Sequence, residues 1–414
     1  MQIPRTYRDF KPYLQKVFRP KKLESVFIFV TSRCNSLCRT CFYWDQLNKN
    51  QDLSFDQIRT ISETAPEFGK LWVSGGEPTM REDLDEIICT FYRNNKIHTL
   101  NFPTNGLLPD NLDRMVGRIL KDCPNLTVDL NFSIDGLANT HDAIRGVPNN
   151  FVKTIATMER MKEKYAGERR LRRNVVTVIT RENYDELVRF GVDMLKRDLS
   201  TGQYFEIIRG NPLDLSLKNI TRQELKALHD KLYAVHAAHA DRLFANVDPS
   251  FRWFPKLYYL GTLKFIFDTH EQNVESPRRW AMPCTAGLTS MVIDHNGEFR
   301  ACELRQPLGK LQDYDFNLSK ALFSERMKKE IAAIPEANCW CTHSCWITDS
   351  LKFSPKVLLF KIPWSWLKAK IQRLPEMSVA DIEKFQEELP AHPSAGPVPP
   401  TAGSQPPSNL VQLQ

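Results

Sequence analysis

The stretch TSRCNSLCRTCFYWDQLN, Thr31 to Asn48, places three cysteines on one short segment with the spacing C-x3-C-x2-C. Cys34, Cys38 and Cys41 follow the apolar run VFIFV, which has the composition of a buried strand. Core packing, a zinc site, a disulfide fragment and an iron–sulfur loop are the four explanations for such a group. Core packing does not explain why the thiols lie on a polar loop. No further Cys or His lies within ten residues on either side to complete a zinc site.

Short β-type runs alternate with helical patterns through the first half of the chain. The intervening helices repeat their apolar residues at helical spacing, and several begin with Ser, Asp or Asn as caps. Alternation of this kind predicts βα units around a parallel sheet. Six units are fewer than the eight of a closed barrel, so the sequence predicts an α/β fold with a (β/α)6 partial TIM barrel. The predicted strands cover residues 25–31, 70–75, 97–104, 126–134, 174–180 and 203–209.

Polar motifs follow the carboxyl ends of the first four predicted strands. The cysteine loop follows the first, SGGEPT (74–79) the second, TNG (104–106) the third and SIDG (133–136) the fourth. Barrel active sites collect at that end of the strands, so we expect these four segments to meet in one site.

Composition and charge exclude several classes of protein. The chain has 414 residues, 42% of them hydrophobic and 25% charged, and no apolar run approaches the length of a spanning helix. No apolar run follows the basic N-terminus as in a secretory signal, so the expected location is the cytoplasm. The net charge of +7 resides in the flanks, with +5 in residues 1–24 and +6 in 352–373, which leaves the remainder at 7 − 11 = −4. This distribution argues against a nucleic-acid groove.

The combination of C-x3-C-x2-C with GGEP at Gly75–Pro78 resembles the radical S-adenosylmethionine (SAM) superfamily over residues 25–210. The resemblance implies a [4Fe–4S] cluster on Cys34, Cys38 and Cys41, with one iron left open for SAM. It also implies that SAM is reductively cleaved to methionine and a 5′-deoxyadenosyl radical, which abstracts a substrate hydrogen. The implied SAM-binding residues are Gly75, Gly76, Glu77, Pro78, Asn105, Ser133, Asp135 and Arg145.

The resemblance assigns roles to several of these residues. GGEP would receive the SAM amino group through backbone oxygens and the Glu77 carboxylate, and Arg145 would pair with the SAM carboxylate. Ile207 or Ile208 would pack on the adenine. Thr40 stands where the family usually has an aromatic residue near the adenine, so Phe42 is the alternative contact.

A second cysteine group lies downstream. Cys284 and Cys302 flank a predicted β-hairpin with an HNG turn, in the pattern C-x12-G-x4-C. The segment NCWCTHSCW adds Cys339, Cys341 and Cys345. This resembles the SPASM and twitch extensions of radical SAM barrels, and five cysteines fit the twitch form, which has one auxiliary [4Fe–4S] cluster. Cys284 and Cys302 are implied ligands, completed by two of the three later cysteines, or by fewer if an iron is left open for substrate.

The same five cysteines allow a different interpretation. Cys284, Cys302 and two of the later three could bind zinc tetrahedrally, and His343 could join them. Cys89 and Cys123 lie alone in helical patterns, and we interpret both as small buried hydrophobic residues.

The segment SPKVLLFKIPWSWLKAKIQRL, 354–374, mixes large apolar residues with Lys and Arg only. It fits a helix lying on an anionic membrane surface, and it also fits a C-terminal helix that closes the open side of the barrel. Pro363 should break or kink it into two pieces. The basic-aromatic N-terminus keeps peripheral membrane association open.

The predicted organisation has six parts, separated by changes in composition and pattern. They are a basic segment 1–24, the barrel 25–212, a helical connection 213–280, a small α+β twitch- or SPASM-like domain 281–350, basic amphipathic helices 351–390 and a disordered tail 391–414.

The predicted function is that of a radical SAM enzyme, an oxidoreductase or another radical-based modifying enzyme. The auxiliary cluster would transfer an electron or anchor the substrate, and a flavodoxin- or ferredoxin-type protein would supply the reducing electron. The substrate is open among a small polar metabolite, a lipid-linked molecule and a peptide, although the short N-terminus leaves no room for a peptide-recognition domain. Arg209, Asn211 and Asp214 either contact the substrate or merely cap a strand end.

Two alternatives compete with this function. One is a non-catalytic, membrane-associated metal or scaffold protein with zinc at the C-terminal cysteines. The other is a nucleic-acid-modifying enzyme, whose binding would depend strongly on salt.

Overall fold

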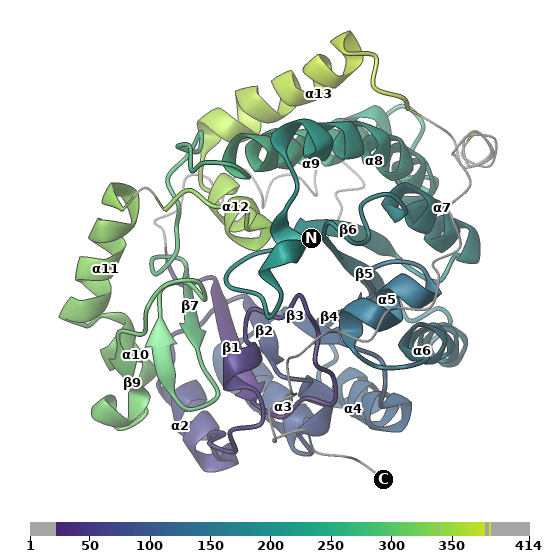
Figure 1. Ribbon diagram of the computed structural model, residues 1–414. Helices are drawn as coiled ribbons and strands as arrows, with labels where there is room; N and C mark the ends of the chain where they lie inside the picture. Colours follow the sequence, from purple (N-terminus) through teal and green to yellow (C-terminus); the bar gives the residue numbers. More distant parts are fainter. Residues whose placement is uncertain (1–21, 338, 377–380, 382–414) are drawn as a thin grey trace.

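The computed structural model describes residues 22–337, 339–376 and 381. Its centre is one sheet with the strand order β6-β5-β4-β3-β2-β1-β7-β8-β9. Strands β1 to β6 pair in parallel with their sequence neighbours, as in a (β/α)6 partial barrel, and the predicted fold class is confirmed (Figure 1). These strands are β1 (Ser25–Thr31), β2 (Lys70–Gly75), β3 (Thr99–Thr104), β4 (Thr127–Ser133), β5 (Leu171–Ile179) and β6 (Gly202–Ile207).

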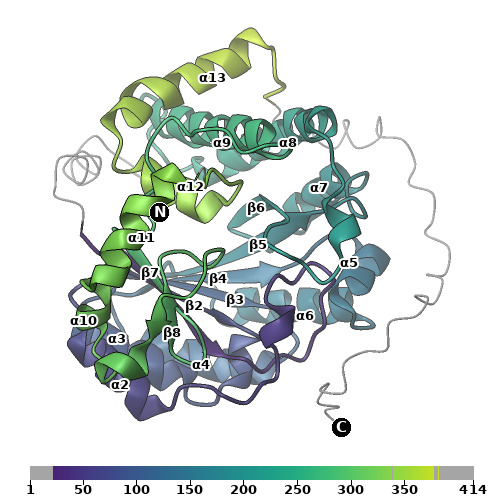
Figure 2. The same cartoon turned by 60° about the vertical axis from the view of Figure 1, so that its left-hand side comes forward.

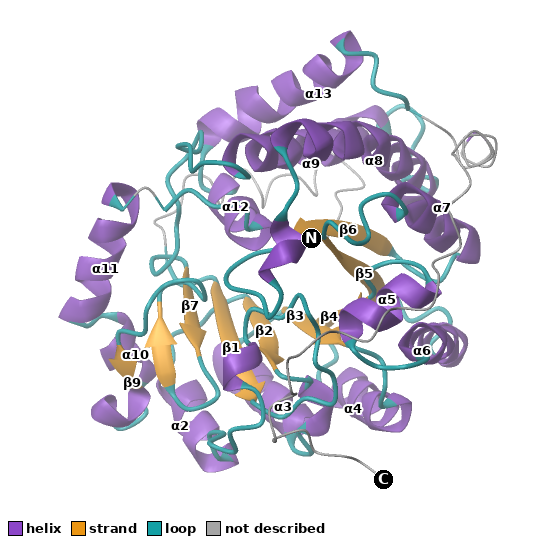
Figure 3. Ribbon diagram, viewed as in Figure 1, coloured by secondary structure: helices purple, strands orange, loops and turns teal. Residues whose placement is uncertain are grey.

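Helices follow the strands and cover the outer side of the curved sheet (Figure 3). The first of them starts at a capping box, in which the Ser54 side chain accepts from Gln57 N and the Gln57 side chain accepts from Ser54 N. The elements between the strands are η1 (Trp44–Gln46), α2 (Phe55–Thr64), η2 (Pro78–Met80), α3 (Leu84–Asn95), α4 (Pro109–Asp122), α5 (Ala138–Arg145), α6 (Asn150–Lys164) and α7 (Leu187–Arg197).

The two faces of the sheet differ in chemistry. On β4, Val128, Leu130 and Phe132 are fully buried and belong to the main apolar core. The alternate residues Asp129, Asn131 and Ser133 lie on the opposite, inner face, because successive side chains of a strand point to opposite sides. The barrel interior is therefore polar along this strand.

Polar side chains on neighbouring strands join across this inner face. Asn174 Nδ2 donates to Asn131 Oδ1 at 3.0 Å, and the Arg172 guanidinium pairs with Asp129 at 2.5 and 2.7 Å. Tyr204 of β6 lies beside them; burial first, and then the Asp129 carboxylate, raise its pKa to about 12. Tyr204 nevertheless keeps 48% of its surface exposed. The interior is thus lined by hydrogen-bonding groups and is not filled by a layer of apolar side chains.

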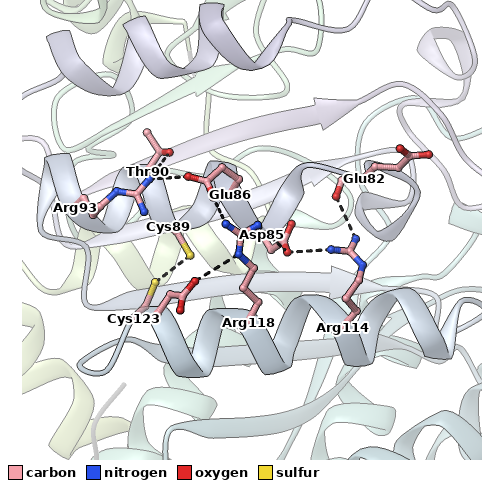
Figure 4. A network of polar contacts seen from close by, with 10 residues as sticks. Glu82, Asp85, Glu86, Cys89, Thr90, Arg93, Arg114, Arg118 and Cys123 are labelled. Carbon is pink, nitrogen blue, oxygen red and sulfur yellow. Dashed lines mark hydrogen bonds and ion pairs between the residues drawn. The ribbon is translucent and has the colours of Figure 1, made fainter.

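The helices α3 and α4 are joined on the outer side by a network of charges and two thiols (Figure 4). Asp85 is buried and pairs with Arg114 at 2.9 Å and with Arg118 at 3.4 Å. Cys123 and Cys89 are buried with their sulfurs 3.4 Å apart. The interpretation of both cysteines as small buried residues is confirmed, and their thiols contact one another.

Beyond β6 the described chain becomes mainly helical and then rejoins the sheet. The hairpin strands β7 and β8 pair antiparallel, as predicted, and β7 pairs in parallel with β1, Val26 opposite Met291. The hairpin therefore extends the barrel sheet beyond β1. These elements are η3 (Leu215–Lys218), α8 (Arg222–Leu243), α9 (Trp253–Asn273), β7 (Ser290–Ile293), β8 (Glu298–Arg300), β9 (Gly309–Lys310), η4 (Leu311–Tyr314), α10 (Leu318–Leu322), α11 (Glu325–Glu336) and α12 (Ser344–Leu351).

The last helix forms an outer layer over α9 in both orientations of the molecule (Figure 1, Figure 2). It consists of a π-helical turn, η5 (Val357–Lys361), that runs directly into α13 (Ile362–Ile371). The predicted break at Pro363 is wrong, because proline stands in the first turn of α13 and the wider π turn precedes it. None of the described helices is both long and apolar enough to cross a membrane.

Three predicted segments fall wholly or largely outside the described residues. They are the basic start 1–21, the end of the amphipathic segment at 377–380 and 382–390, and the tail 391–414.

Candidate active site

The loop after β1 carries Cys34, Cys38 and Cys41 and is fixed from several sides. Cys34 N donates to Asn48 Oδ1 at 3.0 Å, and Cys41 N donates to the Cys38 carbonyl at 3.0 Å. Further bonds join Arg39 N to the Ile144 carbonyl and Leu213 N to the Cys41 carbonyl. The loop is therefore held between the end of α5 and the segment after β6.

The three thiols are half-buried and affect one another electrostatically. Burial, and then the neighbouring Cys38, raise the pKa of the Cys41 thiol to about 12. Burial and Cys38 also raise the pKa of Cys34. Such thiols are expected to become thiolates only when a cation compensates the charge, as metal binding does.

The GGEP segment at the end of β2 lies against this loop. A Cβ on Gly75 would meet the Thr31 carbonyl oxygen at 2.2 Å, and one on Gly76 would meet the Arg33 carbonyl oxygen at 2.1 Å. Gly75 also has φ of 120°. Only glycine permits this approach of the two backbones.

Glu77 is buried and its carboxylate accepts four hydrogen bonds from neighbouring groups. Oε1 accepts from Thr79 N at 3.2 Å, Thr79 Oγ1 at 2.6 Å and Thr104 Oγ1 at 2.8 Å, and Oε2 accepts from Asn105 N at 2.7 Å. The side chain therefore ties the β2 end to the β3 end, and the backbone of the motif remains available for a ligand.

Asn105 extends this connection into the cysteine loop. Its Nδ2 donates to Asn35 Oδ1 at 2.7 Å and to Ser36 Oγ at 3.2 Å. The ends of β1, β2 and β3 are therefore joined by one hydrogen-bonded network.

The end of β4 reaches the same loop through an ion pair. Arg145 Nε lies 2.8 Å from Asp135 Oδ2, and Arg145 Nη1 lies 3.7 Å from the Cys38 sulfur. Asp135 Oδ1 also accepts from Val178 N at 2.8 Å. Ser133 is half-buried on the inner face of β4. Arg145 thus bridges a carboxylate and a cluster-loop thiol.

The segment after β6 covers the far side of the loop. The Arg209 guanidinium lies over the Phe42 ring at 4.9 Å, and its Nε lies 2.7 Å from Glu303 Oε1. Ile207 and Ile208, which directly precede Arg209 in the chain, are buried. Asp214 pairs with Arg39 at 2.7 Å and caps η3 by accepting from Ser216 N. The carboxylate of Asp214 is therefore occupied in the cap and the ion pair.

The second cysteine group gathers around the hairpin. Cys302 is buried, and Cys284, Cys339, Cys341 and Cys345 are half-buried. The pKa of Cys341 is raised to about 12 by burial, with Cys284 and Cys339 as its charged neighbours, and Cys302 has Cys341 and Cys284 as neighbours. The pKa of Cys345 is also raised by burial, but its charged neighbours are Glu206, Arg209, Glu303 and Asp349.

Comparison with known proteins agrees with this geometry. Residues 28–193 match the family model described as the Radical SAM superfamily. This stretch of the chain is therefore similar to the Radical SAM superfamily. GTP 3′,8-cyclase of Staphylococcus aureus (strains JH9 and Newman) is 26% identical over 232 residues, which are 53% of this chain and 64% of the relative. The chain therefore spans less than two thirds of the length of these relatives.

Solved structures share the fold of this chain at low sequence identity. The structure described as native anSMEcpe with bound AdoMet and Cp18Cys peptide has a TM-score of 0.54 at 15% identity, covering 87% of this chain and 99% of that chain. Streptococcus suis SuiB bound to S-adenosylmethionine has a TM-score of 0.51 at 16% identity, covering 78% and 71%. Both similarities extend beyond the barrel.

A radical SAM domain uses a [4Fe–4S] cluster and SAM, and the residues present fit this pair. The donor set on the loop is three thiols, the usual ligands of an iron–sulfur cluster. Within the described part of the chain, no three His, Cys, Asp or Glu side chains are arranged to hold a single metal ion. The loop thus offers three thiols, the donor type that an iron–sulfur cluster takes.

Several residues that support this site were not anticipated from the sequence. His141 Nδ1 accepts from Asp135 N at 3.0 Å, and burial lowers the pKa of His141 to about 4, so the ring is neutral. Glu186 accepts from Leu137 N at 2.8 Å, and its Oε1 would lie 2.1 Å from a Cβ on Gly136. These side chains come from positions without any motif, so no local signal could have identified them.

Proposed function

We propose that this chain is a radical SAM enzyme that reductively cleaves SAM and uses the resulting 5′-deoxyadenosyl radical to abstract a substrate hydrogen atom. The observation that carries the proposal is the junction of four strand ends at one cysteine loop. The cluster would supply the single electron for cleavage. The residues of the chain would ligate the cluster and would bind and position SAM.

Cys34, Cys38 and Cys41 would ligate three irons of the cluster. The backbone of Gly75, Gly76 and Pro78 would face the SAM amino group, because the Glu77 carboxylate already accepts four hydrogen bonds from the chain. We assign Glu77 to positioning the two loops.

The remaining predicted SAM contacts divide into two groups. Asp135 and Arg145 are engaged with one another, so Arg145 would orient Cys38 and present its outer nitrogen to a carboxylate. Ser133 and Asn105 would contact SAM from the inner face and the β3 end. Phe42 carries an aromatic ring and Thr40 does not, which supports Phe42 as the surface on which the adenine stacks. Arg209 lies over this ring.

We further propose one auxiliary [4Fe–4S] cluster on Cys284, Cys302, Cys339 and Cys341. Each of these four thiols has at least two of the others as electrostatic neighbours, whereas the neighbours of Cys345 include Glu206 and Arg209. Arg209 and Glu303 connect the β6 end to the hairpin, which supports communication between the two clusters. The auxiliary cluster would accept an electron or anchor the substrate.

The substrate class is supported by the inner face of the barrel. Its asparagines, the Asp129–Arg172 pair and the half-exposed Tyr204 favour a polar molecule with many hydrogen-bonding groups. A small polar metabolite fits this lining, as would the polar part of a lipid-linked molecule; a peptide fits it less well. Partners under the same proposal are a flavodoxin- or ferredoxin-type donor and an anionic membrane surface.

Iron and sulfide counting tests the two clusters. After anaerobic reconstitution, we expect about eight irons per chain in wild type and about four in the Cys34/Cys38/Cys41→Ala triple variant. Cys89→Ala, which alters a buried thiol outside both sites, should keep the wild-type count. An equal count in wild type and the triple variant would reject the first site.

A matched pair of variants tests which cysteines of the second group ligate the auxiliary cluster. Cys341→Ala should lower the iron content towards four, whereas Cys345→Ala should leave it near eight. About four irons in wild type that fall to none in the triple variant would instead favour zinc at the C-terminal cysteines. That outcome would leave net oxidation without an electron acceptor.

A further inference from the structure

The η5–α13 helix has an inner face that is already used in packing. Val357, Ile362, Ser365 and Ala369 are buried, and Gly261 of α9 allows a close crossing, since a Cβ there would lie 2.6 Å from the Ile362 carbonyl oxygen. Lys368 pairs with Asp268 of α9 at 2.9 Å. This part of the molecule therefore packs on the helical layer.

The outer face of the same helix carries a second set of apolar side chains. Phe360 is 69% exposed, Trp364 55%, Leu367 43% and Ile371 65%, and Leu359 adds another at 46%. The first four follow one another by four, three and four positions, so they form one stripe along the helix. Large hydrophobic side chains exposed elsewhere in the described chain, such as Val152 and Phe323, lie on separate elements.

The charged side chains of the segment that carries the stripe have one sign. Residues 352–373 contain six Lys and Arg and no Asp or Glu. Lys352, Lys368 and Lys370 pair with acids outside this segment. Among the described residues, Lys356, Lys361 and Arg373 have no ion pair.

We propose that the outer face of η5 and α13 docks on the anionic surface of a lipid bilayer. The helix would lie along the interface, with Phe360, Trp364, Leu367 and Ile371 in the acyl boundary and the lysines at the headgroups. Aromatic and aliphatic side chains beside cations are the composition of such interfacial helices. The charges favour this occupant over a second copy, because a two-fold contact would bring two acid-free basic segments together.

The consequence concerns where the enzyme would act. Docking through the outermost helix would hold the barrel beside the bilayer, within reach of a substrate carried on a lipid. This consequence rests on the proposed function, but the docking itself does not depend on radical chemistry. Lipid binding and iron content are measured separately, so one can fail while the other stands.

Flotation of the reconstituted full chain with vesicles tests the proposal. Wild type should float with phosphatidylcholine vesicles that contain phosphatidylglycerol, and weakly or not at all with phosphatidylcholine alone. The Phe360/Trp364/Leu367/Ile371→Ser variant should bind at least about tenfold less tightly. Phe323→Ser, which removes an equally exposed ring on another element, should bind like wild type.

A charge variant separates the two contributions. Lys356/Lys361/Arg373→Gln should weaken binding to the anionic vesicles by roughly fivefold for each cation removed, and added salt should act in the same direction. Circular dichroism and iron content should match wild type in every variant that is compared.

Three results would overturn the proposal. The first is wild type that does not float with the anionic vesicles, and the second is a stripe variant that floats as well as wild type. The third is self-association: a dimeric mass in light scattering, lost in the stripe variant and accompanied by no vesicle binding, would assign the stripe to a contact between copies.

Discussion

Arg145 is the residue through which the protein is expected to tune its first cluster. Its guanidinium spans a buried carboxylate and the Cys38 sulfur, and donors to a cluster sulfur stabilise the reduced, more negative state. Arg145→Lys offers a single point charge and cannot hold both contacts. We expect the reduction potential of the cluster to fall by on the order of 50 mV.

A redox titration followed by electron paramagnetic resonance, without SAM, measures this change. Arg39→Lys is the matched control, because Arg39 lies on the same loop but pairs with Asp214 and Glu182. Its potential should equal that of wild type. An unchanged potential in Arg145→Lys with full iron content would show that the contact with Cys38 does not influence the cluster.

At the scale of elements, the junction of β1 and β2 depends on two glycines without room for a side chain. Gly76→Ala would force a methyl group into the Arg33 carbonyl oxygen and push the cysteine loop away from GGEP. We expect a loss of about 2–3 kcal/mol in the free energy of unfolding, together with weaker SAM binding. Urea unfolding and calorimetry with SAM measure the two effects.

Gly167→Ala provides the comparison for backbone strain alone. Gly167 has φ of 82° and nothing within 4 Å of an added Cβ. The change should cost about 1 kcal/mol and leave SAM binding intact. If both variants behaved alike, crowding at the β1–β2 junction would not be the cause.

The whole molecule is expected to be acid-labile because α8 and α9 bury a set of neutral histidines. Burial lowers the pKa of His229 and His236 to about 3 and that of His239 to about 4, and it lowers that of His270 as well. In the unfolded chain these groups titrate near 6.5, so the unfolded state binds more protons once the pH falls below that value. Stability is therefore full above about pH 6.5 and is lost as the pH falls.

Glu271 acts in the opposite direction. Burial raises its pKa to about 7, so it favours the folded state on acidification, but one carboxyl does not offset four imidazoles. Between pH 7.5 and 5.5 each histidine should cost about 1.4 kcal/mol. Denaturant unfolding at the two pH values should show a net loss of a few kcal/mol.

A single variant isolates one of these histidines. His236→Gln can keep a hydrogen bond to Tyr259 and takes up no proton, so its loss between the two pH values should be smaller by about 1.4 kcal/mol. His98→Gln, at an exposed position, should lose as much as wild type. Equal losses in all three proteins would place the acid sensitivity elsewhere.

The sequence by itself determined the features that depend on local pattern. Alternating apolar runs fixed the six barrel strands, with the largest difference at β5, which begins at Leu171 and not at residue 174. Three further features could be recognised because they depend only on residues that are close together in the chain. They are the spacing of Cys34, Cys38 and Cys41, the glycines of GGEP and the HNG hairpin turn.

Only the tertiary structure decided how these pieces combine. The pairing of β7 with β1, the hydrogen bonds of Glu77 with Thr104 and Asn105, and the placement of Cys345 beside Glu206 and Arg209 all join residues far apart in the chain. The same holds for α13, whose sequence is apolar on both sides. The packing of one side on α9 left Phe360, Trp364, Leu367 and Ile371 exposed. Such choices depend on which surfaces meet when the chain folds, and no local pattern encodes them.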